Sequence, residues 1–158
     1  MGCSGIVKSA VNMNRAIRIG TIALNAAAVA ATLGCGHSPI TAKRIEPALE
    51  TTFANLVELQ VSRLRLPPMK APDFAVTAIC RRVTAGGDVG AGDWTCTIVW
   101  QGPDRRTVRD TYELFVQTDG CYSASASGEG LGGPVLSVRD GSKTRNLLYT
   151  FEGCFDTT

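Results

Sequence analysis

Histidine is almost absent from this chain of 158 residues, which contains only His37. That histidine lies in segment 36–45, which we expect to be a short linker because Gly36 and Pro39 do not favour a stable helix. Catalytic sites of the Ser-His-Asp and Cys-His types need a histidine held rigidly beside a nucleophile. We therefore expect no histidine-dependent catalysis and assign no catalytic residue.

Motifs for bound metals and phosphates are also missing. The chain has no Cys-x-x-Cys pair, and one histidine leaves few ligands for zinc. The glycine-rich segment 84–92 lacks the Gly-Lys-Ser/Thr of a phosphate loop and the acid spacing of a calcium loop. The sequence thus predicts neither a metal site nor a cofactor.

Most of the chain lacks an excess of charge of one sign. There are 16 basic and 14 acidic residues, and three of the bases lie in the first 34 residues, which contain no acid. The remainder has 13 basic and 14 acidic residues, a net charge of −1. Nucleic-acid binding needs a sustained basic surface, so we exclude that class of partner.

What the chain does have is a leader with the order of an export signal. Basic residues precede an uncharged stretch, 19–34, and small residues precede Cys35. This arrangement resembles the lipobox of bacterial lipoproteins, in which the cysteine is acylated and the chain is cleaved before it. The resemblance implies an extension and signal peptide over 1–34, lipid attachment at Cys35, a lipid-anchored tether over 35–46 and an extracytoplasmic position on the cell membrane.

Two other interpretations of the leader stay open. Small residues between Ala26 and Ala31 also suit an ordinary signal peptidase, which would release a secreted protein. Residues 19–35 could instead remain as a membrane anchor, although a helix of about 25 Å is short for a hydrocarbon core of about 30 Å. Met13 alone would begin a normal signal, so we interpret residues 1–12 as an upstream extension.

Residues 47–158 are expected to form one α+β domain with an N-terminal amphipathic helix. The helix should begin near Pro47, which suits a first turn, and end at Pro67-Pro68. Its apolar positions recur every three or four residues. Packing on a sheet explains this face better than membrane contact, because the polar face is not rich in lysine. The stripe comprises Ile45, Leu49, Phe53, Leu56 and Gln60, flanked by Val57, Val61 and Leu64.

Alternating apolar residues then predict an antiparallel sheet of about five strands. The expected strands are a segment around 74–82, one around 94–100, then 108–118, 121–126, 135–138 and 146–155. If Cys80 lies opposite Cys96 in the first hairpin, Ala78 meets Ile98, Val76 meets Trp100 and Arg82 meets Trp94. One register thus aligns both cysteines and the apolar residues, whereas a slip of one residue would turn an apolar face outward.

Four cysteines in an exported domain predict two disulfides. The register favours Cys80–Cys96, which leaves Cys121–Cys154 as the second bridge. The pattern also resembles small actinobacterial envelope lipoproteins of unknown function, which have a helix, a Cys…Trp-x-Cys hairpin and a terminal Gly-Cys-Phe. The matching residues are Cys80, Trp94, Cys96, Gly153, Cys154 and Phe155. This resemblance implies no activity.

Arg105, Arg106 and Arg109, which follow Gly102-Pro103, are the candidate binding residues. Guanidinium groups suit anionic headgroups or a carboxylate-bearing partner. We therefore expect a lipid-anchored extracytoplasmic binding or structural module of the bacterial cell envelope, with the membrane and an envelope protein or anionic ligand as partners. The alternatives are an envelope enzyme that uses carboxylates, with Asp88, Asp93, Asp110 and Glu113 as candidates, and a protein inhibitor or exclusion factor.

Overall fold

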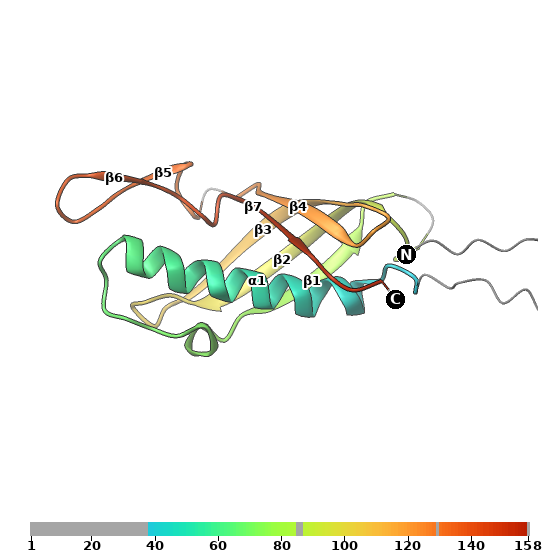
Figure 1. Cartoon of the computed structure of the whole chain (residues 1–158), viewed down its shortest axis with the longest axis horizontal. Coiled ribbons are helices and arrows are strands. Elements are labelled where there is room, and N and C mark those ends of the chain that lie inside the picture. Colours follow the sequence, from blue (N-terminus) through green and yellow to red (C-terminus); the bar gives the residue numbers. More distant parts are fainter. Residues whose placement is uncertain (1–37, 85–86, 129, 158) are drawn as a thin grey trace, which may run out of the picture. The chain divides into compact units, whose positions relative to one another are not determined.

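The computed structural model describes residues 38–84, 87–128 and 130–157. One α-helix, α1 (Ala42–Arg63), lies against one face of an antiparallel sheet (Figure 1). The sheet order is β1-β2-β3-β4-β7, and β5 and β6 form a separate hairpin. The α+β class, the helix-on-sheet packing and the five-stranded sheet are therefore confirmed. The strands are β1 (Thr77–Arg82), β2 (Gly92–Gln101), β3 (Thr107–Val116), β4 (Cys121–Ala126), β5 (Val135–Ser137), β6 (Lys143–Arg145) and β7 (Thr150–Cys154).

The predicted register of the first hairpin is also confirmed. Cys80 pairs with Cys96 and forms a disulfide with it, while Ala78 pairs with Ile98. Cys121 pairs with Cys154 between β4 and β7 and forms the second disulfide. Because both bridges join residues directly opposite each other, each one fixes the register of its strand pair.

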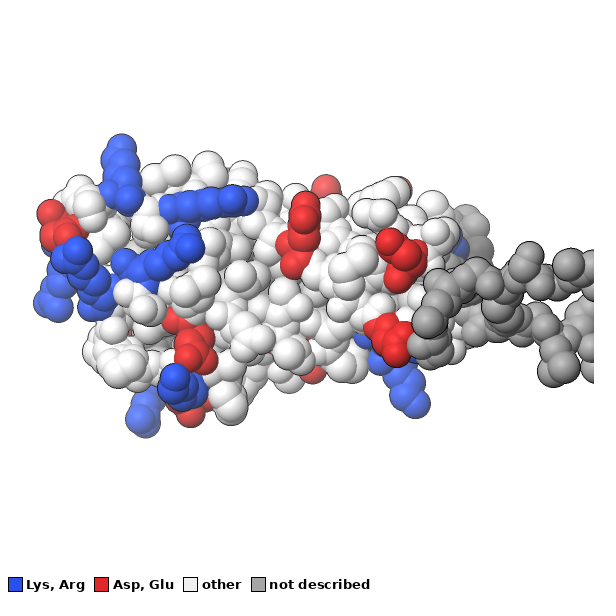
Figure 2. Space-filling model, viewed as in Figure 1, with Lys and Arg blue, Asp and Glu red and all other residues white. Residues whose placement is uncertain are grey.

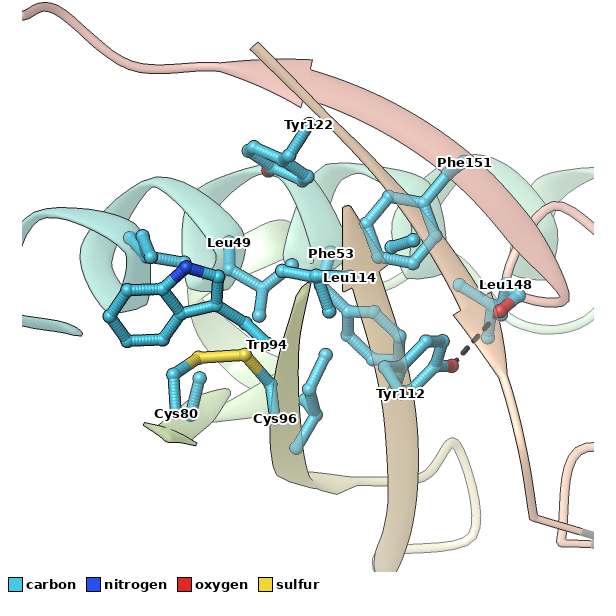
Figure 3. Close-up of a cluster of buried hydrophobic side chains, with 14 of the residues drawn as sticks. Leu49, Phe53, Cys80, Trp94, Cys96, Tyr112, Leu114, Tyr122, Leu148 and Phe151 are labelled. Carbon is cyan, nitrogen blue, oxygen red and sulfur yellow. Dashed lines mark hydrogen bonds between the residues drawn. A yellow bond between two sulfur atoms is a disulfide. The ribbon is translucent and has the colours of Figure 1, made fainter. Parts of the chain in front are cut away.

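Aromatic side chains from the helix and three strands form the centre of the core (Figure 3). Phe53 of α1 lies 4.8 Å from Trp100 and 5.7 Å from Tyr112, measured between ring centroids. Phe151 of β7 packs on the same ring, and the Tyr112 hydroxyl donates to Leu148 O. The face-to-edge contacts bind α1 to the middle of the sheet.

The helix begins at Ala42, so the predicted start near Pro47 is wrong. Pro47 lies within the helix, where its missing N–H removes one backbone hydrogen bond. Burial of Ile40 and Ile45 in the core offsets this cost, because both side chains lose nearly all contact with water. Residues 38–46 consequently belong to the domain and are not a tether; residues 35–37 lie outside the described residues.

Carboxylates of α1 cover the free edge of β1. The backbone N–H of Ala78 donates to Glu50, that of Cys80 to Glu46, and that of Arg82 to Asp88 in the following loop. These three N–H groups point away from β2, where a further strand would pair. Side chains thus replace the missing strand and block edge-to-edge association.

The C-terminal part differs most from expectation. The strand predicted over 146–155 is limited to β7, and residues 143–145 form β6, which pairs with β5. Asn146 is the reason for the break: its Nδ2 donates to the carbonyl oxygens of Leu131 and Gly133, and its Oδ1 accepts from Leu148 N. A buried side chain that bonds three backbone groups holds a turn where the apolar pattern suggested a strand.

Candidate functional site: a basic end of the domain

Two of the three predicted arginines lie on the turn between β2 and β3. Arg105 N donates to Gly102 O, and Gly102 N donates to Arg106 O, each over 2.8 Å. This pattern is a three-residue hairpin loop whose last position is left-handed and normally glycine. Arg105 occupies that position with φ 61°. Arg109 lies in β3 and is exposed on the sheet face opposite α1, so the turn and Arg109 do not form one compact cluster.

A second arginine with a left-handed backbone ends the helix. Arg65 has φ 56°, its N–H donates to Ser62 O, and Leu66 N donates to Val61 O. These bonds define a helix-ending motif in which glycine is the usual residue at the position of Arg65. The Arg65 guanidinium also makes an ion pair of 2.7 Å with Asp140 in the turn between β5 and β6.

The Arg65–Asp140 pair joins the helix end to the β5–β6 hairpin, and the β2–β3 turn lies at the same end of the domain (Figure 1), which we call the basic end. The segments are the end of α1 (63–66), the β2–β3 turn (102–106) and the β5–β6 hairpin (135–145). Together they contain seven Lys and Arg residues and two Asp residues, a net charge of +5. Figure 2 shows Lys and Arg side chains gathered over the C-terminal end of α1 and the β5–β6 hairpin. The cations are Arg63, Arg65, Arg105, Arg106, Arg139, Lys143 and Arg145.

The sequence predicted only Arg105 and Arg106 of this group, because the other cations are scattered over more than 80 positions. Arg65 contacts the hairpin through its exposed ion pair with Asp140, and Gln60 of α1 accepts from Leu147 N just after the hairpin. A hollow of about 570 Å³ lies between segment 67–73 and the β2–β3 turn, with Arg105 in its wall. The tertiary fold, and not a local motif, creates the surface.

The chain enters the domain at the opposite end. Ser38 N donates to Thr157 O, Gly90 N donates to Ile40 O, and Thr41 forms a β-bridge with Val89. The N-terminal segment, the C-terminal segment and the β1–β2 loop are thus held together where α1 begins. Because α1 has 22 residues, its two ends are about 33 Å apart.

The β1–β2 loop is held by the two side chains that the register placed opposite each other. Arg82 donates from its guanidinium to Val89 O and Ala91 O, and Trp94 Nε1 donates to Gly90 O. Arg82 pairs with Trp94, as the register predicted. Both side chains also bond successive carbonyl groups of one loop, so Arg82 fastens this loop.

The structure does not pair the carboxylates of β3. Asp110 faces the core and is 5 % exposed, whereas Glu113 is exposed on the opposite face of the sheet. Asp110 Oδ1 accepts from Thr111 N, and its Oδ2 has no hydrogen-bond partner among the described residues. Burial, with the Asp110 charge as a smaller contribution, raises the pKa of Tyr112 far above its usual value, so this tyrosine stays neutral.

Asp93 and Glu113 do lie near each other, on the open face of the sheet. Both line a shallow hollow of about 460 Å³, together with Phe115, whose ring is 54 % exposed. Asp93 pairs with Phe115 and Thr95 pairs with Glu113, so the two carboxylates are diagonal neighbours on adjacent strands. The sequence analysis did not place Asp93 beside Glu113, because only the register between β2 and β3 brings the two residues together.

The disulfides indicate an oxidising, extracytoplasmic setting. Among the described residues, no group of three or more His, Cys, Asp or Glu side chains is placed to hold a metal ion. Nor does that part of the chain contain a helix long and apolar enough to span a membrane. Cys35 and His37, the predicted lipid site and the lone histidine, lie outside the described residues.

No protein-family model, curated protein or solved structure matches this chain. The fold and the surface therefore define its class by themselves. It is a disulfide-bonded α+β domain whose chain entry lies at one end and whose cations gather at the other.

Proposed function

We propose that this protein is a lipid-anchored extracytoplasmic binding module of the bacterial cell envelope, attached to the membrane through Cys35. The export-type leader and the lipobox-like junction supply the anchor. Two disulfides in the domain that follows agree with an oxidising compartment. Two acyl chains would hold the protein stably, because each buried methylene adds about 0.8 kcal/mol.

The disulfides of the domain that follows the leader are the observation that carries the proposal, and the attachment of Ser38 to Thr157 limits where the anchor would lie. This attachment leaves only Gly36 and His37 between Cys35 and the first residue bonded into the domain. Three Cα–Cα steps span at most about 11 Å. The lipid and the end of the domain that receives the chain are therefore close together, and the basic end is remote from the anchor.

Binding is assigned to Arg105, Arg106 and Arg109, with an anionic ligand. All three are exposed, so they can meet an anion without burial of an unpaired charge. Arginine presents two parallel donors to a carboxylate or phosphate, which gives geometric selectivity as well as attraction.

The anchor is tested by metabolic labelling with a fatty-acid analogue. The wild type should be labelled, and Cys35→Ser should abolish the label and shift the protein from the membrane to the soluble fraction. Intact mass of the native protein reports cleavage, acylation and both disulfides together. An unlabelled wild type that still sediments with membranes would contradict the lipid and favour an uncleaved helix.

The binding assignment is tested with the arginines replaced by glutamine. Binding of the full-length protein to an anionic envelope fraction should weaken with added salt, because exposed charges are screened over about 8–10 Å at ordinary ionic strength. The triple variant should bind less while its circular dichroism is unchanged. Equal binding by both proteins would remove this surface from consideration.

A protein partner on the open sheet face is the second candidate function, corresponding to an inhibitor or exclusion factor. The observation that favours it is a flat face with exposed apolar residues: Ile79 is 65 % exposed and Phe115 is 54 % exposed. Both side chains lie on the sheet face that α1 leaves open, and large exposed apolar side chains are a feature of interaction sites. Ile79→Ser with Phe115→Ser would abolish capture of such a partner and leave anion binding intact.

A further inference from the structure

We infer that the basic end binds a linear polyanion, a chain polymer with repeated phosphate or carboxylate groups, and contacts it at three separate points. The points are the three segments defined above: the end of α1, the β2–β3 turn and the β5–β6 hairpin. This inference names the partner class for the proposed binding module. It depends on the proposed anchor only for the direction in which the basic end points.

Charge complementarity is the first argument. The basic end has a net charge of +5, so the remainder of the chain after residue 34, whose total is −1, has −6. Both aspartates of the basic end are already in ion pairs, Asp104 with Arg106 and Asp140 with Arg65. The described residues provide no ion pair for the other five cations, Arg63, Arg105, Arg139, Lys143 and Arg145. A polyanion is thus attracted to this end and repelled by the rest.

The backbone of the two left-handed arginines is the second argument. Arg65 and Arg105 hold positions where glycine is favoured, and a side chain in this conformation costs about 1–2 kcal/mol. Both residues lie at the basic end, and both side chains point into solvent. Ala75, with φ 45°, has the same kind of backbone outside the basic end, so the strain supports a functional use of the two arginines only together with their exposed charge.

The composition of the three segments selects a polymer over a membrane or a folded protein. None of the three contains an aromatic residue, and their two exposed large apolar side chains, Leu66 and Val135, lie on different segments. Membrane-surface segments use Trp, Phe and Leu to enter the headgroup region, and the centres of protein interfaces are enriched in aromatic residues. The basic end instead offers cations on separate loops, which suits a flexible chain that is bound by charge alone. Its position about 33 Å along α1 from the chain entry also separates it from the anchoring membrane.

The expected binding is strongly dependent on salt and on polymer length. For single-stranded nucleic acid each contact contributes about −0.7 to the slope of log K against log [salt], and the same value applied to five cations gives about −3.5. The same relation makes each contact worth about fivefold in affinity near 0.1 M salt. A long chain that reaches several points gains further from effective concentration, which a short chain cannot do.

The test uses the full chain in a nonionic detergent, with short and long inorganic polyphosphate as probes. Arg105→Gly removes one cation from the turn and also relieves the strain of the left-handed backbone at this position. Arg139→Gln with Lys143→Gln removes two from the hairpin. Lys43→Gln with Arg44→Gln is the matched control, because it removes two charges from the first turn of α1 at the other end. Circular dichroism and melting temperature verify that every variant is folded.

We expect long polyphosphate to bind more tightly than short, about fivefold weaker binding for Arg105→Gly, and more than tenfold for the hairpin variant. The control should bind within twofold of wild type, since 33 Å exceeds the screening length of about 8–10 Å. A polyglutamate arm distinguishes phosphate from carboxylate as the recognised group. Binding of either polymer with this pattern supports the inference.

Three results would overturn it. A hairpin variant with wild-type affinity would show that the points do not act together, while the proposed function, which needs only the arginines around the β2–β3 turn, would stand. Equal affinity for short and long polymers would contradict a contact at several points. Binding to phosphatidylglycerol vesicles with no binding to either polymer would make the partner a membrane. Failure of fatty-acid labelling, by contrast, refutes the anchor and leaves the polymer result valid.

Discussion

Arg105→Gly should stabilise the domain, which is unusual for a substitution that removes a large side chain. The left-handed backbone of Arg105 costs about 1–2 kcal/mol relative to glycine, and glycine gives back about 0.5–1 kcal/mol through its freer unfolded chain. The Arg105 side chain has no ion pair among the described residues that would be lost. The net expected gain in the free energy of unfolding is about 0.5–1 kcal/mol, or about 2–4 °C in Tm for a domain of about 120 residues.

The neighbouring residue supplies the control. Arg106 is also exposed and on the same turn, but its φ is not positive. Arg106→Gly should therefore lower Tm, because glycine adds unfolded-state entropy without relieving strain. Scanning calorimetry with the disulfides intact measures the Tm of each variant and so tests the expected rise for Arg105→Gly and the expected fall for Arg106→Gly. A Tm for Arg105→Gly at or below that of wild type would refute the assignment of strain to this turn, and with it the second argument for polyanion binding.

Three further predictions concern the core, the disulfides and the hairpin. Phe53→Ala should cost about 3–5 kcal/mol, measured by urea unfolding, because three aromatic rings lose their shared contact. Mild reduction followed by alkylation and peptide mapping should open Cys121–Cys154 first, because Cys154 is exposed whereas Cys80 and Cys96 are buried; simultaneous opening would contradict this. Hydrogen bonds from Ser142, and then the charge of Arg65, lower the pKa of Asp140. Because the pKa of Asp140 is lower in the folded state, its ionised carboxylate stabilises the hairpin at any pH above the unfolded-state pKa. This stabilisation is lost as the pH falls through the folded-state pKa. Exchange of the Ser142 amide should therefore accelerate, relative to Asp140→Asn, on acidification below about pH 4.

Periodicity and pairing made much of the fold predictable. Alternating residues around Cys80 and Cys96 exclude a slip of one residue, and among the registers that keep both apolar sets on one face the observed one also places the two cysteines opposite each other. The remaining pair, Cys121 and Cys154, then followed by elimination. Strand alternation and cysteine pairing can be recognised from neighbouring residues and a side-chain period of two, so predicting them requires no knowledge of the tertiary structure.

The predictions of the helix start and of the C-terminal strand were wrong because long-range contacts determine both features. A proline at position 47 normally marks a first helical turn, but burial of Ile40 and Ile45 extends the helix five residues further. Asn146 looked like the first residue of a strand, yet its amide bonds backbone groups more than ten residues away. In both cases a long-range contact outweighed a local preference that was correctly recognised.

The basic end could not have been found from the sequence, because its parts meet only through the fold. The end of α1 and the β5–β6 hairpin are joined by the pair Arg65–Asp140, and residues 67–73 and the β2–β3 turn line one hollow. Arg105 and Arg106 were found because they are adjacent and follow Gly-Pro, whereas Arg139 and Lys143 looked like ordinary hairpin charges. Arg65 makes an ion pair with Asp140, and it has a left-handed backbone that is strained for any residue other than glycine. A glycine there would end the helix equally well and leave the hairpin to its other contacts. Arginine at this position adds a contact that glycine could not make, the pair with Asp140, and places one more cation beside those of the hairpin.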